Sequence, residues 1–216
     1  MKNMQPTSRT RGRPRGFDRD EALADAMETF WRRGYEGASI ADLTEAMGIT
    51  PQSLYAAFGS KAALYREALA EYRRRMGAAN VRALAEEPSA VAALDRVLRQ
   101  TAYEFSRPSH PSGCMISTAA LAVASENEPI ADHLRDLRAG SLAAFKKRIE
   151  QAVAAGEFKP ETDPEALARF LGAIIQGMAV QARDGADAAA LLGIADLASA
   201  TVARHRAGEA AQGGSA

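Results

Sequence analysis

The sequence is poor in the features that mark secreted, membrane-spanning and strand-rich proteins. Its 216 residues include one cysteine, Cys114, so no disulfide can form within the chain. No apolar run reaches the ~18 residues of a membrane helix, and no short apolar segment follows the basic start as in a secretory signal. Apolar and polar residues hardly alternate between turn residues, so strands are not indicated. We therefore expect an all-α, cytoplasmic protein without membrane contact.

Basic and acidic residues balance over the whole chain but not along it. There are 27 Lys and Arg against 27 Asp and Glu, so overall basicity gives no argument for nucleic-acid binding. Residues 1–16, however, carry lysine and arginine and no acid. This segment lacks apolar anchors, and we expect a flexible basic arm there and a disordered tail over residues 207–216. The hydrophobic content of 47% is ample for a core between them.

Residues 17–76 carry a dense series of helix start and stop signals. A residue that can cap a helix N-terminus precedes each apolar-periodic segment, and a glycine follows it. The predicted caps are Asp18, Ser39, Thr50 and Ser60, and the predicted stops are Gly34, Gly48 and Gly59. Pro51 stands at the first helical position, where its missing N–H costs little. The segment is predicted to be a three-helix domain followed by a linking helix.

Residues 77–206 are predicted to form a larger helical domain. Amphipathic helices are indicated after Pro88, from Cys114 to about Ala124, from about Pro129 to Ala155, after Asp163, and from Asp187 to about His205. The last two are apolar over more than the roughly 100° that one buried face needs. We therefore expect them to form a dimer interface that includes Leu171, Ile175, Met178, Leu192, Leu197 and Val202.

Residues 39–58 have the spacing of a helix-turn-helix motif. Two short helices joined by a tight glycine turn, the second starting with polar residues, can place that second helix in the major groove. We expect Gln52 and Ser53 to bond base edges, and Ser39, Thr50, Tyr55 and Lys61 to reach phosphates. Spacing alone also fits a generic helical hairpin with ordinary caps.

Spaced residues in this region resemble one known family. The segment from Phe17 to Tyr72 is similar to the DNA-binding domain of the TetR family of bacterial regulators, in Gly34-Tyr35, Ser39 to Leu43, Met47 to Ile49, and Ser53 to Phe58 with Lys61 and Leu64. The resemblance implies a homodimer that binds double-stranded operator DNA and carries a helical domain for a small-molecule effector. It also implies phosphate contacts for Tyr55 and Lys61.

The basic arm allows two interpretations. Arg11 to Arg15 resembles the core of an AT-hook, in which Arg13 and Arg15 would enter a narrow, A·T-rich minor groove. A solvated basic tail that raises affinity without reading sequence would have the same composition.

No motif of comparable strength follows residue 78. Pockets in helical bundles form between facing helices, and the expected lining is Phe105, Cys114, Met115, Leu121, Phe145, Phe170 and Ile174. Ordinary core packing would use the same residue types. The sequence names neither the effector nor the operator.

Cys114 supports two alternatives to a simple effector site. It follows a Pro-rich loop and opens a predicted helix, where the dipole would favour a thiolate that senses an oxidant, an electrophile or a soft metal. A buried thiol in the core is the other interpretation. An enzyme with Cys114 as nucleophile and His110 as base is a remote alternative, because no orienting acid or phosphate loop is recognisable.

No metal site or cofactor is expected. His110, Cys114, Met115 and His133 are the local candidate ligands, and they lack metal-ligand spacing. An architectural DNA-binding protein would need the arm but not the large apolar C-terminal region. The sequence thus favours a homodimeric repressor that binds a palindromic operator and is released by an effector.

Overall fold

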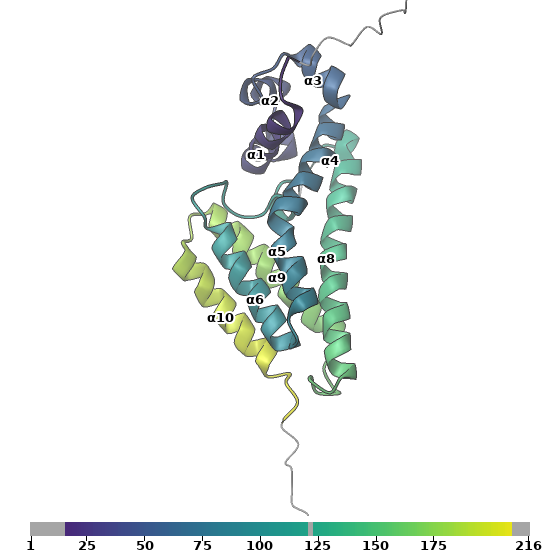
Figure 1. Cartoon of the computed structure of the whole chain (residues 1–216), viewed down its shortest axis with the longest axis vertical. Coiled ribbons are helices and arrows are strands. Elements are labelled where there is room, and N and C mark those ends of the chain that lie inside the picture. Colours follow the sequence, from purple (N-terminus) through teal and green to yellow (C-terminus); the bar gives the residue numbers. More distant parts are fainter. Residues whose placement is uncertain (1–15, 121–122, 209–216) are drawn as a thin grey trace, which may run out of the picture.

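Ten α-helices and no strand make up the part of the chain that the computed structural model describes, residues 16–120 and 123–208 (Figure 1). The predicted all-α class is confirmed. In chain order the helices are α1 (Arg19–Gly37), α2 (Ile40–Ala46), α3 (Pro51–Phe58), α4 (Lys61–Tyr72), α5 (Ala78–Glu86), α6 (Ala90–Phe105), α7 (Met115–Thr118), α8 (Glu128–Ala154), α9 (Pro164–Arg183) and α10 (Ala188–Ala203). None of these helices is long and apolar enough to span a membrane.

Side-chain caps start the first four helices where the sequence predicts them. The Asp18 carboxylate accepts from the amides of residues 20 and 21, and the Thr50 hydroxyl accepts from the Ser53 amide. The Ser39 hydroxyl accepts from the Asp42 amide while the Asp42 carboxylate accepts from the Ser39 amide, which is a complete capping box. Each cap satisfies a backbone donor that has no partner within its helix.

Gly34 interrupts α1 but does not end it. It has φ 73°, and one further turn runs to Gly37. A Cβ at this position would lie 2.8 Å from the Ala119 carbonyl oxygen, which accepts a 3.1 Å hydrogen bond from the Tyr35 amide. Glycine is therefore required both by the backbone conformation and by the close approach of the segment after α7. The sequence predicts a helix stop at Gly34, whereas the contact with Ala119 is tertiary and cannot be recognised from the neighbouring residues.

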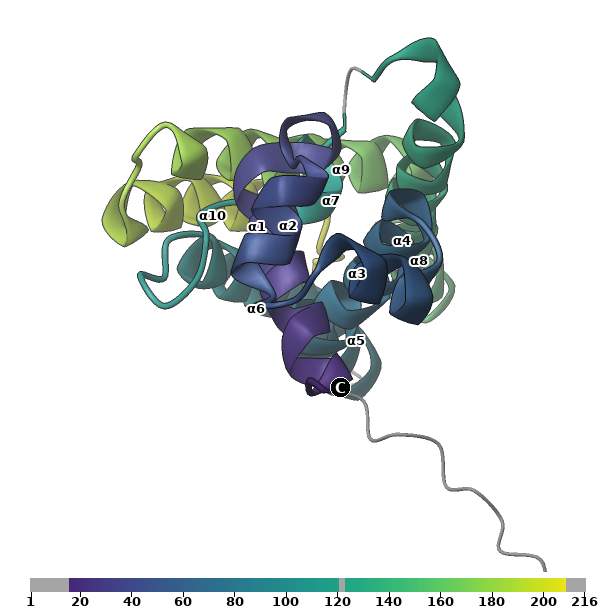
Figure 2. The same cartoon turned by 90° about the horizontal axis from the view of Figure 1, so that it is seen from above.

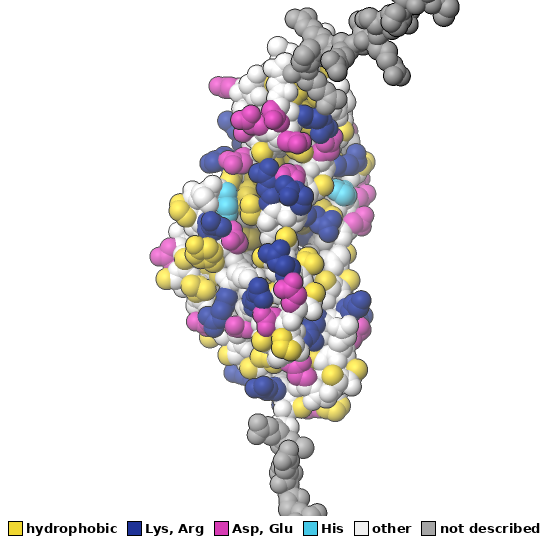
Figure 3. Space-filling view, in the orientation of Figure 1, with side chains coloured by type: hydrophobic (Ala, Val, Ile, Leu, Met, Phe, Trp, Pro, Cys, Tyr) yellow, Lys and Arg dark blue, Asp and Glu magenta, His cyan; other side chains and the backbone are white. Residues whose placement is uncertain are grey.

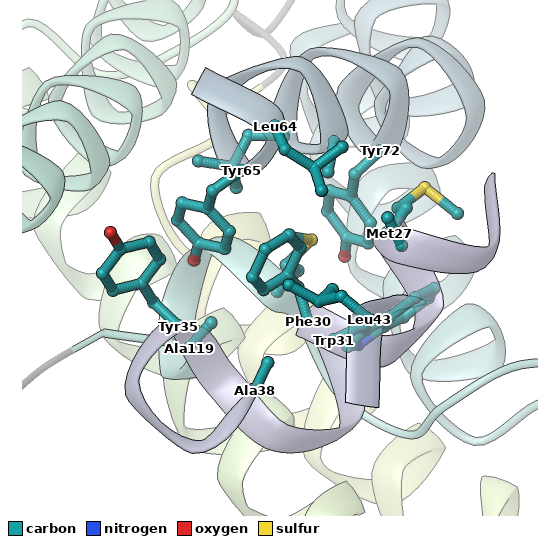
Figure 4. Packing of buried hydrophobic residues seen from close by; sticks show 14 of the residues in the cluster. Met27, Phe30, Trp31, Tyr35, Ala38, Leu43, Leu64, Tyr65, Tyr72 and Ala119 are labelled. Atoms are coloured by element: carbon teal, nitrogen blue, oxygen red, sulfur yellow. The ribbon is translucent and has the colours of Figure 1, made fainter. Parts of the chain in front are cut away.

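The N-terminal core is built from α1 to α4 and closed by residues from beyond them. Phe30 packs edge-on against Tyr65, and Trp31 against Tyr72, each at 4.8 Å between ring centroids. Figure 4 shows the two tyrosines projecting from α4 toward Phe30 and Trp31 on α1. Buried residues of α7 and α8 belong to the same cluster, namely Met115, Ile130 and Leu134. The segment 17–76 thus shares its core with the C-terminal domain.

The helix that links the two domains is continuous but changes pitch. Residues Arg73–Gly77 form a π-helical segment between α4 and α5. Glu71 sits beside it and accepts hydrogen bonds from Arg74 at 2.7 Å and Arg75 at 2.5 Å. The bond from Arg74 is the main reason that the pKa of Glu71 falls to about 2. These ion pairs hold the junction at which a straight α-helix would otherwise continue.

A second apolar core lies among α5, α6, α8, α9 and α10. In Figure 2 the helices α1 to α3 lie over one end of this domain. Helix α3 lies on the same side as α4 and α8, and α10 lies on the opposite side. Glu157, in the loop after α8, accepts hydrogen bonds from the Ser89 hydroxyl and from the Ala90 and Val91 amides at the start of α6. This carboxylate ties the loop after α8 to the start of α6.

The helix predicted to begin at Cys114 is shorter in the structure. The apolar stretch from Cys114 to about Ala124 predicted a helix of that length, but α7 ends at Thr118. The Ala119 carbonyl is bonded by Tyr35 of α1 rather than by a residue further along the same helix. A competing tertiary partner therefore ends the helix early. The helices after it lie close to their predicted bounds.

Candidate DNA-binding surface and ligand cavity

The α2–α3 hairpin presents one short helix outward. Gly48 has φ 63°, and the amide of Ile49 donates back to the Thr44 carbonyl, which closes α2 in a tight turn. Leu54 and Phe58 of α3 are buried in the N-terminal core. On the other face of α3, Gln52 is exposed and Tyr55 is 49% exposed. The geometry is that of a supported recognition helix.

The hydroxyl groups around α3 differ in how many hydrogen bonds they can still make. The Ser39 hydroxyl donates to the Asp42 carboxylate at 2.6 Å, so its hydrogen is already used. The hydroxyls of Thr50 and Ser53 lie 3.0 Å apart, and the pair retains one hydrogen for an outside acceptor. Ser39 is therefore a poorer phosphate donor than the sequence suggested, whereas Thr50 and Ser53 keep that capacity.

Lys61 lies in the first turn of α4, next to α3. Its ammonium nitrogen is 4.5 Å from the centroid of the Tyr35 ring. Partial burial lowers the pKa of Lys61, and the nearby carboxylate of Glu36 opposes that effect. The ring holds the cation beside the amide-rich start of α4, where an anion is favoured.

The basic arm leaves the described structure beside the recognition helix. Arg13 and Arg15 lie outside the described residues. Gly16 and Phe17 line a groove of about 430 Å³ together with Gly48, Thr50 and Ser53 of the helix-turn-helix. The arm therefore starts next to the surface that α3 presents.

A cavity of about 810 Å³ lies below the N-terminal helices. Its wall is formed by α1, the α4–α5 connection, α6, α7, α8 and α9, so it touches both domains. Of the predicted lining residues, Phe105, Cys114 and Phe145 face this cavity. The volume is in the range of sites for drug-sized ligands, about 300–1,000 Å³.

Three other predicted lining residues do not contribute to the cavity. Met115 is 0% exposed and packs in the N-terminal core, because the single turn of α7 directs it away from Cys114. Phe170 and Ile174 pack against the C-terminal core. Leu121 lies outside the described residues. Apolar character alone could not separate cavity wall from core.

The sequence interpretation missed the polar part of the cavity wall. Trp31 lines it and is 1% exposed, and its Nε1–H has no hydrogen-bond partner within the described residues. The Oε1 of Gln100 also has none there. Arg138 also lines the cavity. The sequence could have indicated this residue, because it interrupts the apolar stripe of α8 at helical spacing between Leu134 and Leu142.

Cys114 is half-buried in the cavity wall and lies near the hydroxyl of Tyr72. Burial, followed by the charge and hydrogen bond of Cys114, raises the pKa of Tyr72 well above its ordinary value. Burial likewise raises the pKa of Tyr65, whose hydroxyl has no hydrogen-bond partner among the described residues. Because α7 is one turn long, the predicted helix dipole at Cys114 loses its basis.

His110 is held by its surroundings rather than directed at Cys114. Its ring stacks on Trp31 at 4.7 Å, Nδ1 lies 3.0 Å from the Pro111 carbonyl, and Nε2 lies 3.4 Å from a Glu104 carboxylate oxygen. Both ring nitrogens thus have oxygen partners other than the thiol. In the part of the chain that is described, no group of three or more His, Cys, Asp or Glu could hold a metal ion.

Half of the predicted dimer-interface residues are buried inside the protomer. Leu171, Met178 and Val202 are at most 1% exposed, because neighbouring helices of the same chain cover them. They cannot contact a second chain, and that part of the prediction was wrong. Leu197 is 74% exposed on α10, while Ile175 and Leu192 are half-buried. Val180 on α9, which was not predicted, is 46% exposed.

Two polar contacts fasten α1 to the C-terminal domain. The Arg183 guanidinium, at the end of α9, donates to the carbonyls of Trp31 at 3.3 Å and Arg32 at 3.2 Å. The Glu36 carboxylate accepts from the Ala124 amide and the Asn127 side chain, each at 2.9 Å. The bond from Ala124 is the largest cause of the lowered pKa of Glu36. The helix that supports the hairpin is therefore tied to the domain that holds the cavity.

An outward recognition helix joined to a helical domain with an internal cavity defines a class of DNA-binding regulators. Residues 22–68 match the model of bacterial regulatory proteins of the tetR family, and residues 90–193 match the tetracyclin repressor-like C-terminal domain. The chain is 38% identical over 192 residues to the HTH-type transcriptional repressor ComR of Escherichia coli K12, covering 88% of this chain and 91% of that protein.

A second relative and a solved structure agree with these matches. The HTH-type transcriptional repressor BdcR of the same organism is 30% identical over 178 residues, 82% of this chain and 85% of its own. A cysteine variant of the TetR family regulator CifR, complexed with 26-bp double-strand operator DNA, superposes with a TM-score of 0.85 at 44% identity, covering 88% of this chain and 98% of that one. This chain belongs to the TetR family of bacterial transcriptional regulators, as its motifs predicted.

Proposed function

We propose that the protein is a homodimeric repressor that binds palindromic operator DNA through α3 and is released when a small molecule occupies the cavity. The observation that carries this proposal is the composition of the cavity wall. Trp31 of α1 and the α4–α5 connection both line it, so the wall includes the elements that position the hairpin. A ligand that changes their spacing changes the position of α3.

The DNA contacts follow from the exposed face of the hairpin. Gln52 and Ser53 reach base edges in the major groove, while Thr50, Tyr55 and Lys61 bond phosphates on the flanks. The arm that starts beside α3 adds charge or minor-groove contacts through Arg13 and Arg15. The operator complex of the CifR variant supports double-stranded operator DNA as the partner.

Dimerisation sets the spacing of the two recognition helices, one α3 from each protomer, which read the DNA. Two α3 helices must enter successive major grooves about 34 Å apart. The exposed apolar side chains of α9 and α10, Val180 and Leu197, supply a face for the second protomer. Ligand binding that moves α1 or α4 in each protomer would take the readers out of register, so that effector and operator oppose each other.

The function is tested by selecting operator DNA from a random duplex library with the purified full-length protein. We expect enrichment of a palindrome bound by one or more dimers, with saturable binding by fluorescence anisotropy. A library of small organic molecules should then contain compounds that release this DNA. A variant with the cavity blocked, Ala144→Trp, should bind the operator but resist release. Equal affinity for selected and random duplexes would contradict the proposal.

A second candidate, sensing of oxidants or electrophiles through Cys114, is favoured by the position of this thiol in the cavity wall beside the Tyr72 hydroxyl. Hydrogen peroxide would oxidise the thiol to a sulfenic acid, with water as the other product, and N-ethylmaleimide would take up both sulfur and proton across its double bond. Operator release by these reagents should be lost in Cys114→Ser. Identical release curves for the two proteins would end this candidate.

A further inference from the structure

The cavity has hydrogen-bond donors left over but hardly any free acidic group. Glu104 is the one carboxylate among its described lining residues. That carboxylate already accepts from Arg107 at 3.1 Å and lies 3.4 Å from His110 Nε2. Trp31 Nε1, by contrast, donates to nothing in the described structure although the side chain is buried. A buried donor without a partner is unfavourable, because it has lost its hydrogen bond to water.

Arg138 is a partly buried cation without a carboxylate partner. Its Nη1 donates to the Ile116 carbonyl at 3.0 Å, and no Asp or Glu of the described residues forms an ion pair with it. Burial lowers the pKa of Arg138, and the positive charge of Arg135 lowers it further. A guanidinium away from water is stabilised by a counter-ion. Among the described residues, none supplies a counter-ion for Arg138, so a bound anion could take that role.

Two other arginines at the cavity are already paired with carboxylates, and Arg73, which has no ion pair among the described residues, is exposed to water. Arg74 pairs with Glu71 at 2.7 Å, and Arg99 pairs with Asp95 and Asp196 at 3.0 and 2.7 Å. They therefore do not compete with Arg138 as a strong anion site. Figure 3 shows Lys and Arg side chains gathered along the middle of one face, where α4 and α5 run in Figure 1.

The rest of the wall is apolar and wide enough for an organic body. Leu84, Phe105, Leu142, Phe145 and Ile175 line it. An inorganic anion would leave this surface unfilled, whereas an aliphatic or aromatic group would cover it. The part of the wall around Arg138 thus favours an anionic group, and the apolar part favours an aliphatic or aromatic body on the same ligand.

We propose that the effector is an organic anion of medium size, with one carboxylate-type group bonded by Arg138 and an apolar body against the phenylalanines. The proposal deepens the repressor function and rests on it for its biological meaning. A ligand held by Arg138 of α8 would also lie against α1, because Trp31 lines the same cavity. Since α1 supports the hairpin, neutralising Arg138 is also the step that connects ligand chemistry to the DNA-binding helix.

The test compares two fluorescent probes of nearly the same shape, anionic 1-anilinonaphthalene-8-sulfonate and uncharged N-phenyl-1-naphthylamine, titrated into the DNA-free full-length protein. We expect Arg138→Gln to weaken the anionic probe about 10- to 100-fold, the value of a charge-assisted bond, and to leave the neutral probe within about twofold. Arg138→Lys keeps the charge without the planar fork and should lose less. Lys147→Gln removes an exposed cation of the same helix that does not line the cavity, and should change neither probe.

Ala144→Trp identifies the cavity as the binding place, because filling it should weaken both probes. Equal loss of the two probes in Arg138→Gln, or no loss of either, would overturn the anion proposal. The release assay then compares decanoate with 1-decanol on operator complexes, and decanoate should act at the lower concentration. Failure to bind any operator would refute the repressor function, and the probe titration would still decide the ligand chemistry.

Discussion

At the scale of single residues, the exposed face of α3 separates side chains by the partner they can reach. Gln52 offers both a donor and an acceptor, which matches the edge of a base pair. Tyr55 ends in one hydroxyl, which suits a phosphate oxygen. The Ser39 hydroxyl is committed to Asp42 and holds the start of α2.

Substitutions on α3 should therefore change either affinity or selectivity. Tyr55→Phe should weaken operator and random DNA by the same factor, about 2- to 12-fold for one hydrogen bond. Gln52→Ala should weaken the operator by about 1–3 kcal/mol and random DNA much less. Fluorescence anisotropy with both duplexes measures the two effects, and exposed Gln151→Ala on α8 is the matched control. Equal losses on both duplexes for Gln52→Ala would reject its role as a base reader.

Glu157 should make stability depend on pH in the acid range. Burial raises the pKa of Glu157, but hydrogen bonds from Ala90, Ser89 and Val91 outweigh it, so the folded-state pKa lies below the ordinary 4.5. The interaction therefore stabilises the fold above pH 4.5 and is lost as the pH falls through the lower folded-state value.

Glu157→Gln should lower the free energy of unfolding at pH 7 by about 1–2 kcal/mol. The difference from wild type should shrink as the pH drops below 4.5. Urea unfolding at a series of pH values measures it, with exposed Glu161→Gln as the control. A difference that stays constant down to pH 3 would show that the charge of Glu157 is not what caps α6.

At the scale of elements, α1 and α9 are joined by a contact that no local pattern indicates. Arg183 lies 152 residues after Trp31, whose carbonyl it bonds. Gly113 makes this approach possible, because a Cβ there would lie 2.5 Å from the Ala179 carbonyl oxygen and 3.0 Å from the Arg183 side chain. The end of α1 is thus fixed by two segments of the C-terminal domain.

Breaking this contact should loosen α1 without unfolding α9. Arg183→Gln is expected to speed hydrogen exchange of the amides in residues 31–37 and to lower stability by about 1–2 kcal/mol. Arg169→Gln removes an exposed arginine of the same helix and should leave both unchanged. Exchange measured by mass spectrometry on the free protein provides the readout, and unaltered protection of residues 31–37 would contradict the role of Arg183.

At the scale of the whole molecule, the exposed apolar side chains of α9 and α10 are the face that we propose for the second protomer. Leu197 is 74% exposed and Val180 46% exposed, while Leu171, Met178 and Leu191 on the same helices are buried in the protomer itself. A stable interface buries more than about 1,000 Å², so these residues form part of a larger contact.

Leu197→Glu should shift the protein from dimer to monomer. A carboxylate buried between protomers loses its hydration without a partner. Light scattering after size-exclusion chromatography measures the mass, and circular dichroism should be unchanged because the residue supports no core. The control Ala85→Glu alters an exposed position of α5 and should leave the mass at that of the wild type. If the Leu197→Glu protein remained a dimer, the interface would have to lie on another surface of the protomer.

The sequence by itself determined the helices whose starts and stops are local. The caps Asp18, Ser39, Thr50 and Ser60 and the glycine turn at Gly48 act within a few residues, so their spacing predicted the hairpin and its family. Only the tertiary structure decided which apolar residues line the cavity, which face a partner, and which close the core. Met115 is fully buried in the N-terminal core, whereas its neighbour Cys114 packs against that core and also lines the cavity. The apolar character of a side chain does not indicate which of these surroundings it will have. Arg138 and Trp31 line one cavity because separate helices bring them to the same wall.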